Sequence, residues 1–164
     1  MSTVVNIFEY AMQMEKDGEN YYRKLSQRMT NKGLQIILLM LAEDEVKHCN
    51  VIEKMQAAEA DIAETTVLMD AKSIFSQIKE SGESFSFDIK ETELYIKARD
   101  IGERSWNFYL EKAGEVKEGY QRELFLRLAK EEKKHYFLLD NIITFMSEPQ
   151  RWLENAEFCH LEEY

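Results

Sequence analysis

Two short segments of the sequence have the residue types and the spacing of a metal-binding site. Each is a glutamate followed three positions later by a histidine: Glu45 with His48, and Glu132 with His135. On an α-helix, positions i and i+3 lie on the same face, so the carboxylate and the imidazole of one segment can bind the same ion. These ligands suit iron, manganese or zinc, and ligand type alone does not choose among the three metals.

The apolar residues around both pairs place them on the buried face of a helix. The first pair lies on a stripe of residues spaced by four and three positions, between Leu41 and Ile52. The second pair lies on an equivalent stripe between Leu128 and Leu139. Burying an ionised carboxylate without a partner is costly, and a metal ion would remove that cost. The alternative interpretation is a buried network of glutamate–histidine hydrogen bonds without a metal.

The two pairs belong to an internal repeat of the sequence. A shift of 87 residues, the step from Glu45 to Glu132, aligns the first half of the chain with the second half without a gap. Further identities across this shift are Ala11 with Ala98, Asn20 with Asn107, Tyr22 with Tyr109, Leu39 with Leu126, Leu41 with Leu128, Ala42 with Ala129, and Lys47 with Lys134. The repeat predicts two copies of a helical hairpin, related by pseudo-twofold symmetry.

The helical spacing predicts an all-α fold with four long helices. We expect them at about residues 3–29, 34–55, 89–113 and 120–146, with turns at 30–33 and 114–119. Short turns make each consecutive pair an antiparallel hairpin, and a long crossover joins the hairpins. A short amphipathic helix is expected within the crossover, at residues 69–80. Pro149 should stop the fourth helix. This divides the chain into a bundle, 1–147, and a short C-terminal tail helix, 148–164.

Composition and charge exclude several classes of protein. The net charge of −10 disfavours binding to nucleic acids and to anionic membrane surfaces. The two cysteines, Cys49 and Cys159, are too few and too far apart for a disulfide scaffold, a zinc ribbon or a four-cysteine iron site. The sequence has no run of 18 apolar residues and no secretory signal pattern. We therefore expect a soluble, cytoplasmic protein.

The segment MEKDGENYY, followed by LAEDEVKHCNVI, resembles the rubrerythrin and ferritin-like di-iron family. The resemblance extends over the whole chain, and the tail PQRWLENAEFCHLEEY is similar to the ends of small stand-alone members. It implies a ferritin-like four-helix bundle that holds two iron ions, with manganese or zinc as other possible metals. The implied metal ligands are Glu15, Glu45, His48, Glu132 and His135, with Glu45 and Glu132 bridging the two ions.

The sequence departs from this pattern at Gly102, which is the repeat counterpart of Glu15 and cannot bind a metal. Two other carboxylates are candidates for the missing ligand. Glu103 is about 100° away around the helix and would need a π-bulge or a register shift to turn inward. Glu19 lies one turn beyond Glu15 and is more often a solvated residue. A five-ligand site would hold two ions with an open coordination position, or one ion tightly and the other weakly.

The resemblance also implies redox chemistry, in the form of peroxide reduction or ferrous-ion oxidation. Catalysis would then involve the three glutamates together with Tyr22 and Tyr109 near the metals, although ordinary core packing explains each tyrosine equally well. Peroxide or dioxygen would be the small-molecule substrate, a separate protein would donate electrons, and the chain would form a homodimer. The alternatives are a non-catalytic metal-binding or iron-handling protein, and a structural protein with a vestigial site.

The tail contains a third Glu-x-x-His segment, formed by Glu157 and His160. With Cys159 and Glu163 nearby, it could form a separate surface metal site. The more ordinary interpretation is an exposed amphipathic helix that docks through Trp152 and Phe158.

Overall fold

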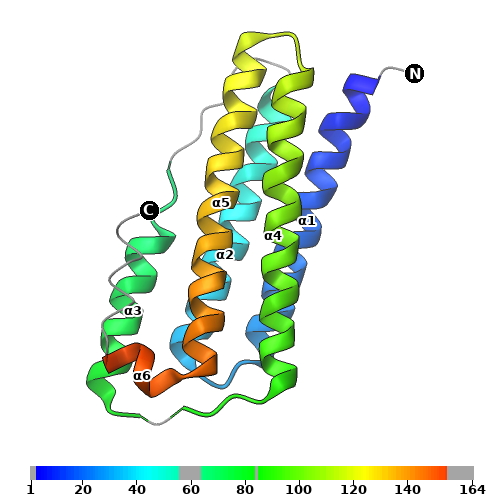
Figure 1. The fold of residues 1–164 in the computed structure, drawn as a ribbon. Coiled ribbons are helices and arrows are strands. Elements are labelled where there is room, and N and C mark those ends of the chain that lie inside the picture. Colours follow the sequence, from blue (N-terminus) through cyan, green and yellow to red (C-terminus); the bar gives the residue numbers. More distant parts are fainter. Residues whose placement is uncertain (1–2, 56–63, 84, 155–164) are drawn as a thin grey trace.

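The computed structural model describes residues 3–55, 64–83 and 85–154. These residues form helices and connections only, with no strand among them. The helices are α1 (Thr3–Arg28), α2 (Lys32–Met55), α3 (Val67–Ser81), α4 (Ile89–Glu115), α5 (Gly119–Ser147) and α6 (Pro149–Glu154). The four long helices run side by side, and α3 and α6 lie near one end of the bundle (Figure 1).

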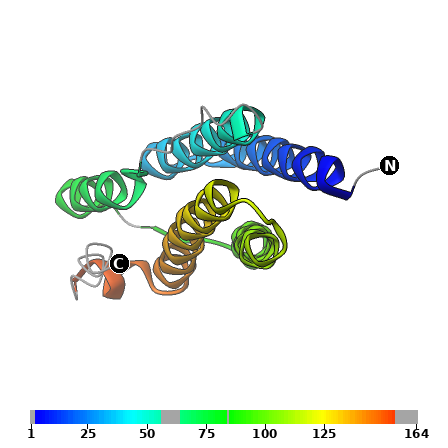
Figure 2. The same cartoon turned by 90° about the horizontal axis from the view of Figure 1, so that it is seen from above.

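The long helices form two hairpins that face each other. Helix α1 packs along α2, and α4 packs along α5. Seen along the bundle, α1 and α2 make one layer and α4 and α5 make the other (Figure 2). Helix α3 contacts α2 and α5, so the crossover lies against both layers. The predicted all-α, ferritin-like bundle of two hairpins with a short C-terminal helix is therefore confirmed.

The turn inside the first hairpin is shorter than the sequence predicts. Helix α2 already begins at Lys32, because Asn31 caps it: the Asn31 side-chain oxygen accepts a hydrogen bond from the Leu34 backbone N–H at 3.0 Å. The turn inside the second hairpin is also shorter, since α4 continues through Gly114 to Glu115. Short turns hold the paired helices in antiparallel contact along their length.

The crossover helix α3 (Val67–Ser81) covers the predicted residues 69–80 and extends slightly beyond them at both ends. It ends at Gly82, whose φ of 68° is the left-handed conformation that glycine adopts at a helix C-terminus. Helix α4 then starts at a capping box, in which Asp88 accepts from the Glu91 backbone and Glu91 accepts from the Asp88 backbone. At the other end of the chain, Pro149 is the first residue of α6 and so begins a new helix where α5 stops.

The buried apolar residues form two clusters, one toward each end of the bundle. Leu38 and Leu139 belong to the cluster that also contacts α3 and α6. Ile52 and Phe125 belong to the second cluster, near the opposite end. Along α1, α2 and α5, the residues between the two clusters include buried charged side chains. The fold therefore places a polar layer in the middle of an apolar core. Among the described helices, none is both long and apolar enough to cross a membrane.

Candidate metal centre

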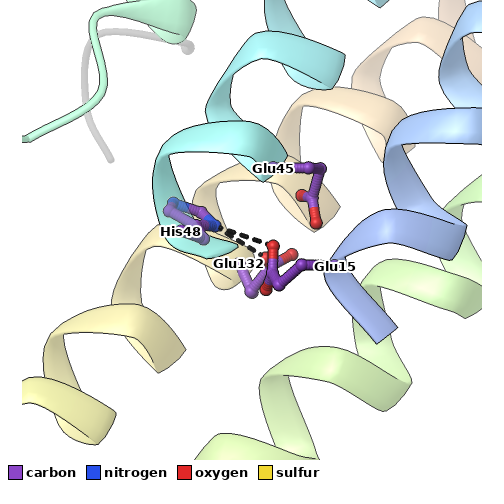
Figure 3. A group of neighbouring side chains, drawn as sticks. All are labelled: Glu15, Glu45, His48 and Glu132. Carbon is purple, nitrogen blue, oxygen red and sulfur yellow. Dashed lines mark hydrogen bonds and ion pairs between the residues drawn. The ribbon is translucent and has the colours of Figure 1, made fainter. Parts of the chain in front are cut away.

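Three helices direct buried ligand side chains into the polar layer. Helix α1 contributes Glu15, α2 contributes Glu45 and His48, and α5 contributes Glu132 (Figure 3). One ligand atom from each of these four residues lies within 4.8 Å of the ligand atoms of the other three. His135 of α5 adjoins this group and is itself fully buried. The structure thus brings together all five residues that the family resemblance implies as ligands.

Each histidine approaches the glutamate of the other Glu-x-x-His segment. His48 Nδ1 lies 3.0 Å from Glu132 Oε1 and 3.3 Å from Glu15 Oε2. His135 Nδ1 lies 3.1 Å from Glu45 Oε1 and 3.7 Å from Glu132 Oε2. The two imidazole rings are stacked, with centroids 5.7 Å apart and planes inclined by 20°. The Nδ1 atoms of both histidines therefore face the same carboxylate cluster.

Crowding of charge perturbs the protonation of the cluster. Burial and the neighbouring carboxylates raise the pKa of Glu45 well above its ordinary value. Burial and the charge of Glu15 also raise the pKa of Glu132. Burial alone would lower the pKa of His48, but the Glu15 and Glu132 carboxylates raise it well above its usual range. Burial opposes ionisation of Glu15, yet the charge of His48 and several hydrogen bonds lower its pKa to about 2.

The residues of the cluster fit a divalent metal ion. Three carboxylates that are at most 2% exposed meet at one place. Glu15 Oε2 is fully buried and lies 3.3 Å from His48 Nδ1, but it has no hydrogen-bond partner. A buried acceptor without a donor is costly, and a coordinating cation would satisfy it. Carboxylate and imidazole ligands on facing helices are typical of di-metal bundle sites.

Both tyrosines expected near the site contact its residues. Tyr109 of α4 donates a hydrogen bond from its hydroxyl to Glu15 Oε1 at 2.5 Å. Tyr22 of α1 places its ring edge-on against the His135 ring, with centroids 6.5 Å apart. Burial, together with the nearby carboxylates, raises the pKa of both phenols well above the usual value. Both tyrosines therefore remain protonated at neutral pH, and Tyr109 orients Glu15 as a donor.

Helix α4 gives the described cluster no ligand. Gly102 is buried, and a Cβ atom added there would lie 3.9 Å from the Tyr136 backbone nitrogen of α5, an ordinary van der Waals distance. The two candidates for a replacement ligand lie elsewhere. Glu103 is exposed on α4, and the Glu19 carboxylate pairs with Arg23 at 2.7 Å. Neither side chain is brought to the cluster: Glu103 is exposed, and Glu19, on nearly the same face of α1 as Glu15 but one turn further along, is bound by Arg23.

Sequence reasoning missed one residue that contacts the centre. Asp44 of α2 is 7% exposed, and its Oδ2 lies 2.9 Å from His135 Nε2, the ring nitrogen away from the cluster. The only sequence signal was its place beside Glu45, about 100° around the helix, where a carboxylate is usually solvated. The remaining candidates, Glu157 and His160 of the tail, lie outside the described residues.

A protein-family model matches the first part of the chain. The family model described as Rubrerythrin matches residues 6–104, which is more than half of the 164-residue chain. The matched region runs from α1 into α4 and includes Glu15, Glu45 and His48. It ends before α5, so the assignment of Glu132 and His135 rests on the internal repeat and on their position in the structure. No curated protein and no solved structure showed a significant match.

Proposed function

The chain belongs to the rubrerythrin family, and from this premise we propose that it binds two iron ions in the polar layer and uses them to reduce peroxide or to oxidise ferrous ion. The observation that carries the proposal is the group of four buried side chains whose ligand atoms lie within 4.8 Å of one another. Its ligand types also suit manganese or zinc.

Two adjacent ions, typically about 3.5–4 Å apart, would polarise a bound oxygen species and supply two electrons together. The chain's own residues prepare this chemistry. Glu45 and Glu132 enter from opposite hairpins, which suits carboxylates that bridge two ions. Tyr109 holds a proton within hydrogen-bond distance of Glu15. The apolar clusters on either side of the layer limit the access of water, which strengthens each electrostatic interaction inside.

Electrons for repeated turnover would come from a donor outside these 164 residues. The chain contains two cysteines, fewer than the four that a rubredoxin-type iron site requires. With a net charge of −10, the protein would favour a basic or small donor on electrostatic grounds.

The test begins with the reduced, iron-loaded protein. Its absorbance is followed in a stopped-flow instrument after mixing with hydrogen peroxide or with dioxygen. A faster reaction with peroxide supports a peroxide reductase, and a faster reaction with dioxygen supports a ferrous-ion oxidase. The proposal is wrong if neither oxidant changes the spectrum of a protein that retains its iron.

A matched pair of variants controls this experiment. Glu15→Gln removes a carboxylate inside the cluster, and Glu103→Gln makes the same change on the exposed face of α4. We expect the first to slow oxidation and the second to leave it unchanged. If Glu103→Gln slows oxidation as much as Glu15→Gln does, Glu103 is a ligand in the metal-loaded protein. If neither substitution slows it, the Glu15 carboxylate is not needed for the reaction.

A second candidate function is metal binding without turnover. This alternative is favoured by Gly102, because the repeat would place there a carboxylate equivalent to that of Glu15. With no ligand from α4 in the described cluster, one of the two ions would be bound more weakly than the other. Iron that is retained, but not oxidised by either reagent, would support this alternative.

A further inference from the structure

We infer that Thr65, in the crossover segment before α3, is a positioning residue that fixes the orientation of His135 through Asp44. The inference rests on the proposed metal centre for its functional meaning. The connection itself is a set of contacts among three described residues. It links a segment outside the four long helices to an imidazole in the polar layer.

Asp44 determines which nitrogen of His135 faces the cluster. Asp44 Oδ2 lies 2.9 Å from His135 Nε2, and His135 Nδ1 lies 3.1 Å from Glu45 Oε1. An Nε2–H donated to the aspartate leaves Nδ1 as the nitrogen that can bind a metal. Carboxylate partners of this kind set both the ring orientation and the basicity of metal-binding histidines.

Thr65 in turn holds Asp44. The Thr65 hydroxyl donates a hydrogen bond to Asp44 Oδ2, the same oxygen that contacts His135. The Thr65 backbone N–H donates to Glu131 Oε1 at 2.8 Å. A carboxylate with two donors on one oxygen has little freedom to rotate, so removing the threonine hydroxyl should release both Asp44 and the ring it orients.

The two carboxylates that Thr65 contacts occupy equivalent positions in the internal repeat. Asp44 and Glu131 are counterparts under the shift of 87 residues, and each directly precedes a glutamate of the cluster. A single residue of the crossover therefore contacts equivalent carboxylates on α2 and α5. Thr65 ties the two hairpins together at the level of the candidate metal centre. Any movement of the crossover would be transmitted to Asp44 and from there to His135.

A structural role is the competing explanation, because the Thr65 hydroxyl also accepts from the Val67 backbone N–H at 3.1 Å. Thr65→Val removes the hydroxyl with little change of shape, and Thr65→Ser restores it. Thr66→Val is the matched control: the neighbouring Thr66 is exposed, and its hydroxyl bonds to Asp70 at 2.8 Å. Asp44→Asn removes the charge while leaving the contact between Thr65 and Val67 in place.

The first measurement uses nitrogen-15 NMR of the histidine rings in the metal-free protein. Thr65→Val should shift the Nε2 resonance of His135 and speed the exchange of its proton with water. His48, whose ring stacks on that of His135, should show a smaller shift than His135 does. Thr65→Ser should restore the wild-type spectrum, and Thr66→Val should have the same spectrum as the wild type. An unchanged His135 resonance in Thr65→Val overturns the inference.

The second measurement is calorimetric titration with manganous or zinc ion. Thr65→Val and Asp44→Asn should each lower the affinity for one of the two ions by about tenfold to a hundredfold, the usual effect of losing a partner of a metal-binding histidine. The double variant should lose no more than the worse single variant, because both act on one contact. If Thr65→Val and Asp44→Asn bind metal as tightly as Thr66→Val does, the inference is overturned. A wild-type protein that binds no metal overturns the proposed function instead, and the NMR result still decides whether Thr65 orients His135.

Discussion

Replacing Gly18 with alanine tests how tightly the structure holds Glu45. Gly18 is a buried residue of α1 that faces the Glu45 side chain of α2. A Cβ atom added at Gly18 would lie 3.1 Å from Glu45 Oε2 and 3.5 Å from the Glu45 carboxyl carbon. The first contact is closer than an ordinary van der Waals distance, which begins at 3.4 Å. The Glu45 carboxylate must therefore move by a few tenths of an ångström.

That displacement is large for a metal ligand, since metal–ligand distances vary by only about 0.2 Å around their ideal values. We expect Gly18→Ala to weaken metal binding by about tenfold, the lower end of the range for disturbing the support of a ligand. The same substitution should stabilise the helix by about 0.5–1 kcal/mol, because alanine loses less backbone entropy than glycine. Metal affinity and helix propensity are thus predicted to change in opposite directions.

Gly102→Ala is the matched control. It makes the same chemical change in a buried position of α4, but the new Cβ atom would be 3.9 Å from its nearest neighbour. Both variants should gain helix propensity, and only Gly18→Ala should lose metal affinity in a calorimetric titration with ferrous or manganous ion. If the two variants bind metal equally well, Glu45 is not held against Gly18 in the metal-loaded protein, and the reasoning fails.

Three further predictions concern the same centre. Replacing both His48 and His135 with alanine should remove most of the bound metal, measured by elemental analysis, and should lower the melting temperature of the metal-loaded protein to that of the metal-free form; full retention of metal would exclude the site. Gly102→Glu has space for its Cβ atom, and its carboxylate should strengthen binding of the more weakly held ion, so that calorimetry gives two nearly equal affinities. An unchanged weak site would show that the open coordination position is not at Gly102. The pKa values of His48 and Glu45 are raised in the metal-free fold, so this fold favours the protonated forms of both residues. The stability that the bound protons contribute is therefore present at low pH and is lost as the pH rises through the folded-state pKa values. Because metal displaces those protons, the difference in melting temperature between the loaded and metal-free forms should widen from about pH 5 to pH 8, and a constant difference would contradict this proton linkage.

The helices, their pairing and most residues of the candidate centre could be predicted from the amino-acid sequence. Apolar residues at helical spacing predicted the four long helices, and the 87-residue repeat predicted two equivalent hairpins. These are local and periodic properties, so they can be read without knowing how the hairpins meet. The same periodicity placed the pairs Glu45–His48 and Glu132–His135 on buried faces, because a charged residue on an apolar stripe needs a partner.

The contacts between residues of different helices depend on how the helices pack, and the sequence did not predict them. The tertiary structure pairs each histidine with the glutamate of the opposite segment, an arrangement that depends on the axial register of α2 against α5. The roles of Asp44 and Thr65 could not be predicted from the sequence either. Asp44 lies off the apolar stripe and Thr65 lies in the crossover, so periodicity marks neither residue. Their roles follow from contacts across 91 and 21 residues of sequence, which the packing of the two hairpins and the path of the crossover create.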